Sequence, residues 1–308
     1  MNYNRAGENF ADDGILPLKR KTHSVAVPVA ILMAAMVLFQ LGAVIAKGLF
    51  PIVGAPGTTA LRMAWASLIL LIAWRPWRTR YRGGELKIIA AYGLALGFMN
   101  LCFYLSLRSI PLGIAVALEF AGPLFLAIAA SRRALDFLWI VLAAAGLIAL
   151  LPLGLGARSL DPAGVGYGLA AGVCWALYIH FGRKAGAAHG GQTTALGMLV
   201  GALVIVPIGA ADAGRQLLSP HLVPAALGVA LLSSAMPYSL EMLAMPRLPT
   251  RTVSVLMSLD PALGALSGLL FLGERLSWIQ WSAVASIMLA SAGSAITGRE
   301  PGPHLLPE

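Results

Sequence analysis

The chain has 308 residues, of which 58% are hydrophobic and only 11% are charged, and its mean hydropathy is +0.81. A soluble domain usually carries about a quarter charged residues, so most of this chain is expected to lie in lipid. Its net charge of +9 does not indicate nucleic-acid binding, because the basic residues lie between apolar runs rather than in one stripe on a folded surface. Composition therefore predicts an all-α integral membrane protein and excludes the soluble classes.

Ten apolar runs of about 20 residues, the length that crosses a bilayer as a helix, follow one another along the chain. Asp161-Pro162 is typical of a helix start, with aspartate as the N-cap and proline at the first helical position. We expect the polar segments 1–24 and 298–308 to be disordered cytoplasmic tails. The predicted transmembrane helices are residues 26–46, 56–74, 86–107, 110–130, 136–153, 162–182, 192–211, 222–243, 249–272 and 278–297.

Lysine and arginine are distributed unevenly between the two sides of these spans. With the N-terminus inside, sixteen of them fall on the inner side, five fall on the outer side, and Arg62 lies within a span. Cytoplasmic loops are enriched in Lys and Arg, so the N- and C-termini are both predicted to be cytoplasmic.

The two halves of the chain share two sequence patterns at nearly equal offsets, 138 and 135 residues, which favours duplication of a five-helix unit. We predict these units to be residues 25–155 and 160–297. Because five is odd, the second unit would enter the membrane from the opposite side, giving two inverted five-helix repeats of the kind that suits alternating access. The matching patterns are the proline pairs Pro111/Pro123 and Pro249/Pro261, and the tetrapeptide TTAL at 58–61 and 193–196.

Four longer motifs lie in or beside the predicted spans: residues 48–62 (GLFPIVGAPGTTALR), 111–124 (PLGIAVALEFAGPL), 131–139 (SRRALDFLW) and 236–252 (MPYSLEMLAMPRLPTRT). They resemble the drug/metabolite transporter superfamily, EamA type, and within it the bacterial threonine/homoserine exporters. The resemblance runs over roughly residues 28–297. It implies a ten-helix exporter in the bacterial cell inner membrane, with a central cavity, driven by the proton gradient and acting on threonine, homoserine and related amino acids.

Four ionisable residues lie inside the predicted spans: Arg62, Glu119, Glu241 and Asp260. A charge at mid-membrane costs about 2.5–3.5 kcal/mol on insertion scales, so each of them requires a partner or a function. A zwitterionic amino acid needs a cation or N–H donors for its carboxylate and an acid or a carbonyl for its ammonium group. This set contains both kinds and is the first candidate for a site that binds substrate and protons.

Prolines accompany two of these acids. Glu119 lies four residues before Pro123 on the same helix face, and the proline leaves the carbonyl of Glu119 without its helical hydrogen bond. Asp260 is followed by Pro261, which frees the carbonyl of Met257 in the same way. We hypothesise that Glu119 binds the substrate ammonium or the coupling proton, with Asp260 as the rival candidate, and that both prolines break their helices.

Two of the four charges have an alternative role. Arg62 is expected with equal weight to form an internal salt bridge that fixes its helix, because buried charges are usually paired. Glu241 lies near the inner end of its span, where water or Arg247 is within reach.

Polar and aromatic residues at helical spacing complete the candidate site. Small-molecule cavities commonly combine apolar aromatic walls with a few polar groups. Single residues of these types also form interfacial belts or contacts between helices, so each candidate has this alternative. The candidates are Gln40, Lys47, Asn100, Tyr104, Trp175, Tyr178 and Tyr238.

Three pairs of glycines are four residues apart, a spacing that lets helices approach closely. With ten helices in one chain, close contacts inside the chain are favoured over dimerisation, and the oligomeric state stays open. The pairs are Gly93/Gly97, Gly197/Gly201 and Gly264/Gly268.

Cofactor and enzyme chemistry find no support in the sequence. Cys102 and Cys174 lie in apolar runs and the five histidines lack metal-ligand spacing, so neither a metal nor another cofactor is expected. A phosphate-binding glycine loop is absent, which argues against direct use of ATP. The leading hypothesis is a secondary exporter of small amino acids by proton antiport. The alternatives are an exporter of other metabolites or drugs and, less favoured, a membrane-embedded enzyme.

Overall fold

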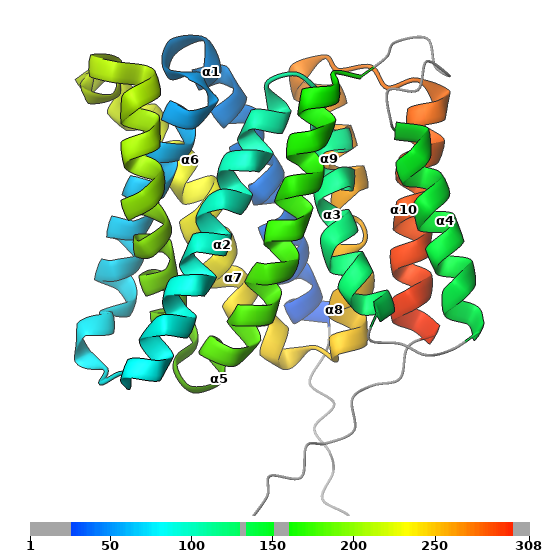
Figure 1. The fold of residues 1–308 in the computed structure, drawn as a ribbon, viewed down its shortest axis with the longest axis horizontal. Helices are drawn as coiled ribbons and strands as arrows, with labels where there is room; N and C mark the ends of the chain where they lie inside the picture. Colours follow the sequence, from blue (N-terminus) through cyan, green and yellow to red (C-terminus); the bar gives the residue numbers. More distant parts are fainter. Residues whose placement is uncertain (1–25, 130–133, 151–159, 298–308) are drawn as a thin grey trace, which may run out of the picture.

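The computed structural model describes residues 26–129, 134–150 and 160–297, and the regular structure in these ranges is entirely helical. The all-α prediction is therefore confirmed, whereas both predicted tails lie outside the described residues. The helices stand side by side in one bundle, with the connections between them at its two ends (Figure 1). We call the end that holds the 75–82 connection the lower end and the end that holds Gly54 the upper end, as drawn in Figure 1.

Helix α1 (Ala26–Trp74) is a hairpin of two helical parts rather than one straight rod (Figure 1). The turn is at Gly54, whose φ of 67° and ψ of 174° are non-helical and favour glycine. A side chain at this position would also meet the carboxylate of Asp212. Pro51 and Pro56 flank the turn and lack the N–H groups that would continue the helix. The predicted helices 26–46 and 56–74 correspond to the two parts.

Helix α5 (Pro162–Ala213) is divided in the same way at Gly190, where φ is 37° and ψ is −110°. Its start confirms the predicted cap, since the Asp161 carboxylate accepts from the N–H groups of Ala163 and Gly164 with Pro162 at the first position. A hydrogen bond from Ser109 and these two N–H bonds hold the pKa of Asp161 below its ordinary value.

The other helices complete the bundle. Among them, α8 and α9 lie within the predicted helix 249–272, and a turn at Ser258 and Leu259 separates them directly before Asp260 and Pro261. Helix α3, in contrast, continues through Pro123. These helices are α2 (Gly83–Leu107), α3 (Leu112–Ala129), α4 (Ala134–Leu150), α6 (Val223–Ala230), a π-helical turn η4 (Leu231–Ala235), α7 (Met236–Ala244), α8 (Thr250–Met257), α9 (Asp260–Leu272) and α10 (Trp278–Thr297). Short 3₁₀ turns, η1 (Pro76–Arg78), η2 (Gly214–Leu218), η3 (Pro220–Leu222) and η5 (Met245–Arg247), lie at their ends.

Seven helical segments of the described chain are long and apolar enough to cross a membrane, with all of α1 counted as one of them. Two further apolar stretches, Leu112–Leu126 and Phe137–Leu150, are shorter. The chain is therefore a multi-pass membrane protein, and the count of ten spans stays a prediction. The described chain begins and ends at the lower end of the bundle (Figure 1). The side of the membrane that this end faces also stays a prediction.

Glycines allow a close contact between α2 and the second part of α5. A Cβ atom added to Gly93 would lie 2.5 Å from the carbonyl oxygen of Gly197, and one added to Gly97 would lie 3.0 Å from the Cα of Gly201. Two of the three predicted glycine pairs thus face each other, which confirms that they serve packing inside the chain. Small residues allow this approach because lipid tails supply no hydrophobic force between helices and close van der Waals contact must bind them.

We predict that Gly93→Ala lowers the free energy of unfolding by about 1–3 kcal/mol, the usual cost of overpacking, because the new methyl group would meet backbone. Unfolding of the purified protein in detergent measures the effect. Gly166→Ala, in the first part of α5, is the control, since a Cβ atom there meets nothing within 4 Å. Equal stability of the two variants would contradict the assigned contact.

Candidate functional site

Arg62, in the second part of α1, is a buried cation with a defined set of neutral partners. Its side chain is only 5% exposed. The Nε atom donates to the hydroxyl of Ser234 at 2.9 Å, and Nη2 donates to the backbone carbonyl of Ser233 at 2.8 Å. The guanidinium carbon lies 5.2 Å from the centre of the Tyr104 ring, within the range of a cation–π contact. These contacts compensate part of the cost of removing the charge from water.

The carbonyl of Ser233 is available to Arg62 because of the residue four positions later. In an α-helix this carbonyl would accept from residue 237, which is proline and has no N–H. The chain forms the π-helical turn η4 over Leu231–Ala235 at this point, and the freed carbonyl accepts the arginine instead. Gly42, in the first part of α1, lies directly against Ser233, where a Cβ atom would overlap it. The local sequence of η4 and α7 therefore creates the acceptor that holds Arg62.

Arg62 does not form the salt bridge that was considered as its alternative role, within the described part of the chain. The ion pair found there joins Lys47 to Glu274, and Arg62 forms none with a described residue. A guanidinium has five N–H donors. Two of them, on Nε and Nη2, bond to the serines. Three remain, including the pair on the Nη1–Nη2 edge that suits a carboxylate.

Three acids lie in the same region as this cation, and none of them forms an ion pair with it. Glu119 on α3 is within electrostatic range of Arg62 and of Asp260. Asp260, the first residue of α9, is 9% exposed, and its Oδ1 atom has no hydrogen-bond partner among the described residues. The side chain of Gln40 lies near its carboxyl group. Glu241 on α7 is within range of Asp260. The fold thus brings the four predicted charges and Gln40 into one region.

Tyrosines surround the Glu241 part of this region. The rings of Tyr92 and Tyr178 stack with their centres 4.8 Å apart, and Tyr238 meets Phe39 edge to face at 5.3 Å. The carboxyl of Glu241 is within electrostatic range of all three tyrosines. Carboxyl and hydroxyl groups from α2, α5 and α7 therefore share one neighbourhood.

Three residues of this region were missed by the sequence analysis. Ser233 and Ser234 carry the strongest contacts to Arg62, and Tyr92 completes the tyrosine group. A signal for the serines was present, because Ser233 stands four residues before Pro237 in the same apolar run. Tyr92 offered none, since a single tyrosine in an apolar span is equally typical of packing.

The other polar candidates are engaged in the packing of the bundle. Asn100 is 4% exposed and donates to the carbonyl of Leu96 at 2.7 Å, one turn earlier in its own helix. Tyr104 is fully buried beneath Arg62, and its hydroxyl has no partner among the described residues. Trp175 meets Phe120 edge to face at 5.6 Å.

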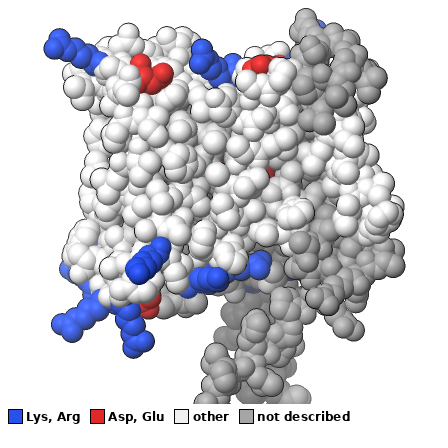
Figure 2. Space-filling view, in the orientation of Figure 1, with Lys and Arg blue, Asp and Glu red and all other residues white. Residues whose placement is uncertain are grey.

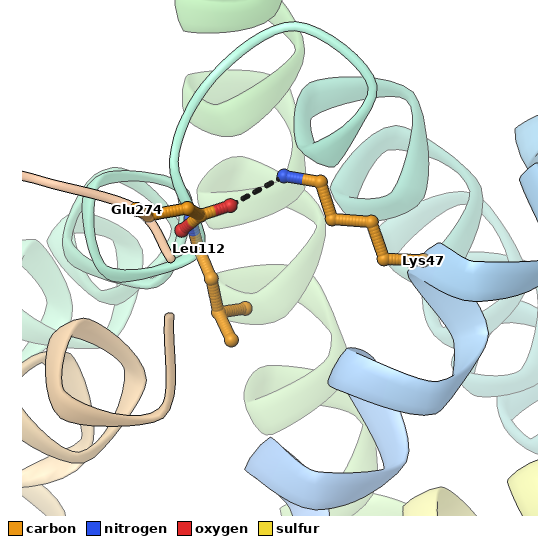
Figure 3. Close-up of polar contacts among 3 residues, drawn as sticks. All are labelled: Lys47, Leu112 and Glu274. Atoms are coloured by element: carbon orange, nitrogen blue, oxygen red, sulfur yellow. Dashed lines mark hydrogen bonds and ion pairs between the residues drawn. The ribbon is translucent and has the colours of Figure 1, made fainter. Parts of the chain in front are cut away.

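Lys47 lies at the upper end of the bundle rather than beside Arg62. Its Nζ atom is 2.5 Å from Oε1 of Glu274, in the connection between α9 and α10 (Figure 3). The other carboxylate oxygen of Glu274 accepts from the backbone N–H of Leu112 at 2.7 Å, at the start of α3. Glu274 thus ties together three segments that are far apart in the sequence.

Metal ligands do not gather in the part of the chain that the structure describes, where no group of three or more His, Cys, Asp or Glu could hold an ion. The free thiols Cys102 and Cys174 lie near each other, one on α2 and one on α5.

Similar proteins share both the family pattern and the fold. The model of the EamA-like transporter family matches residues 162–296. The protein named threonine/homoserine exporter RhtA in Escherichia coli strain K12 is 51% identical over 285 residues, which cover 92% of this chain and 97% of that protein. The protein of the same name in Salmonella typhimurium strain LT2 is 51% identical over 287 residues, covering 93% and 97%. A solved crystal structure with 18% identity, whose description names no function, has a TM-score of 0.56 over 88% of this chain and 97% of its own. That similarity concerns the fold alone.

We predict that Ser234→Ala lowers the free energy of unfolding by about 1–3 kcal/mol, because a buried N–H of Arg62 loses its acceptor. Ser239→Ala in the same helix is the matched control. Its hydroxyl donates only to the carbonyl of Ala235, one turn earlier, so we expect a change of about 0.5 kcal/mol or less. Denaturation of both purified variants compares them. A Ser234→Ala protein as stable as the control would remove the serine from the set of groups that hold Arg62.

A second prediction concerns the upper ion pair. We expect Lys47→Glu to lower the unfolding free energy by about 1.5–3 kcal/mol, the contribution of a hydrogen bond to a charged group. Adding Glu274→Lys restores opposite charges but only part of the stability, because lysine cannot accept from the N–H of Leu112. Thermal unfolding of the two single variants and the double variant tests this order. Full recovery in the double variant would show that the bond to Leu112 contributes nothing.

Proposed function

Because the chain belongs to the EamA-like transporter family, we propose that it is a secondary exporter of small amino acids, threonine and homoserine among them, in the inner membrane of a bacterium. The observation that carries this proposal is the set of contacts that hold Arg62. Its charge is held by neutral oxygens, so the cation is fixed in place but keeps free donors. One acid, Glu119, lies within electrostatic range of it, as recognition of a zwitterion requires.

Arg62 would bind the carboxylate of the substrate. The serines use the donors on Nε and Nη2, which leaves the Nη1–Nη2 edge for a bidentate contact. Lysine at this position would keep the charge but lose the fixed, planar arrangement of donors. The proposal therefore assigns Arg62 an orienting role as well as an electrostatic one.

Glu119 would bind the ammonium group of the substrate or the coupling proton, with Asp260 as the rival. Both acids are within electrostatic range of each other, and Gln40 is next to Asp260. An ammonium group and a proton compete for one carboxylate, so each leaves when the other binds. This competition gives antiport: the proton gradient loads the acid from outside, and substrate displaces the proton on the inside.

Alternating access would come from two inverted five-helix repeats, residues 25–155 and 160–297, with both termini in the cytoplasm. In this arrangement Lys47 and Leu112 belong to the first repeat and Glu274 to the second, so their contact closes the upper end of the bundle between the repeats. The upper end would face outward, and this contact would have to open for release of substrate.

Aromatic pairs support a second candidate, an exporter of aromatic or cationic metabolites in the same superfamily. Tyr92/Tyr178, Phe39/Tyr238 and Phe120/Trp175 surround the charged region. Aromatic faces bind organic cations as well as apolar groups. Competition between labelled threonine and a panel of such compounds separates the two candidates.

Transport by the purified protein in liposomes tests the proposal. Vesicles loaded with labelled threonine or homoserine are diluted with and without an imposed pH gradient. We expect gradient-driven export from the native protein, and a loss of at least about tenfold, equivalent to 1.4 kcal/mol, in Glu119→Gln and in Arg62→Lys. Glu85→Gln is the control, since Glu85 lies in the first turn of α2, where its carboxylate caps the helix start, away from the site.

The outcomes have distinct meanings. If Glu119→Gln still exchanges internal for external substrate but ignores the gradient, Glu119 carries the proton. If exchange also stops, it binds the substrate. Full gradient-driven export by Glu119→Gln would exclude it from the mechanism, and the same experiment on Asp260→Asn would then test the rival.

A further inference from the structure

An open apolar groove lies on the outside of the bundle at its lower end. Its volume is about 430 Å³. It runs between the end of α1, the start of α2 and the second part of α5, and the connection 76–81 forms one wall. The residues that line it include Leu71, Trp77, Tyr81, Leu86, Leu196 and Leu199. In a membrane, an acyl chain suits such a groove better than water does, because burying apolar walls against an apolar group is favourable.

Five cations stand around the mouth of this groove. Arg75, Arg78, Arg80, Arg82 and Lys87 are all exposed, and none forms an ion pair with another residue of the described ranges. Figure 2 shows Lys and Arg side chains gathered at the lower end of this face, where Figure 1 places the connection between α1 and α2.

One acid accompanies these five cations between positions 75 and 87, and it already has a role. Glu85 accepts from the backbone N–H of Arg82 at 2.8 Å and so caps the start of α2. Its carboxylate offsets one of the five positive charges, so an excess of four remains between positions 75 and 87. The mouth of the groove is strongly and locally cationic.

In the connection between α1 and α2, residues that line the groove alternate with exposed arginines. Trp77, Thr79 and Tyr81 line the groove, while the arginines at 78, 80 and 82 are exposed between them. Thr79 and Arg82 have extended backbone geometry, in which neighbouring side chains point to opposite sides. The backbone is also tied down, since the N–H of Arg78 bonds to the carbonyl of Arg75 and that of Thr79 to Pro76. One short, ordered segment thus presents an apolar wall and a cationic rim.

From this combination we infer that the groove is a binding site for an anionic phospholipid, with one acyl chain along the leucines and the phosphate headgroup among Arg78, Arg80 and Arg82. A zwitterionic lipid would fill the groove but gain little from the rim, because its own ammonium group meets the same cations. A free phosphate would meet the rim but leave the groove empty. Basic pockets between helices at a membrane surface are suited to anionic headgroups. Bound lipid would fasten α1, α2 and α5 together at this end.

Lipid retention by the full-length protein tests this inference, independently of what the protein transports. Delipidated protein in detergent is titrated with phosphatidylglycerol, with phosphatidylcholine of the same chains, or with glycerol phosphate. Native mass spectrometry counts the bound lipid, and the thermal midpoint reports stabilisation. We expect one retained phosphatidylglycerol, at least about tenfold tighter than phosphatidylcholine, and no stabilisation by glycerol phosphate.

Three variants locate the site. Arg78→Gln with Arg80→Gln should remove the preference for the anionic lipid, and Leu199→Trp should weaken both lipids by filling the groove. Arg108→Gln with Arg215→Gln is the matched control, because both are exposed arginines distant from the groove, next to the upper-end connections. Equal affinity for both lipids would overturn the inference, as would an equal loss in the control or full stabilisation by glycerol phosphate alone.

Discussion

The arrangement of the bundle around its site depends on one constraint: a guanidinium that cannot lose its proton must be hydrogen-bonded inside an apolar protein. Arg62 meets this constraint with the carbonyl that Pro237 leaves unbonded and with the hydroxyl of Ser234. This places the second part of α1 against η4. It also fixes the cation by neutral groups, so that its charge still acts on its surroundings. A carboxylate partner would have held the same side chain equally well but cancelled that charge.

The need to hydrogen-bond polar groups inside the bundle also explains the contacts of Glu274 at the upper end. The first N–H groups of α3 lack partners within their own helix, and in lipid-like surroundings such groups are expensive to leave free. Glu274 supplies an acceptor to Leu112, and Lys47 balances the charge of that carboxylate. A helix cap therefore becomes a link between segments that are distant in the chain. In the proposed function the same contact would also close the upper end, and its few separable bonds would let it open.

Close packing allows these polar contacts to form where they do. Gly93 and Gly97 bring α2 against the second part of α5, and Gly42 brings the first part of α1 against Ser233. Each approach leaves no room for a side chain, so helices from distant parts of the sequence are held at fixed separations. In the proposed function, such fixed separations would hold the charged groups at the distances needed to bind a proton or an ammonium group. The lower-end groove lies outside this tightly packed part, where lipid can reach it.

The sequence alone determined the membrane environment, the all-helical class, the transporter family and the set of charges within the apolar runs, because each follows from composition, run length or a contiguous motif. It also located the start of α5, since Asp161 and Pro162 act within a single turn. Which neighbours the charges meet was decided by the tertiary structure. Arg62 bonds to residues that are 171 and 172 positions away in the sequence, and Lys47 bonds to a residue that is 227 positions away. Local sequence patterns cannot predict contacts between residues so far apart. The salt bridge considered for Arg62 was as consistent with the sequence as the serine contacts that the fold provides, because only the packing of α1 against η4 brings the free carbonyl within reach.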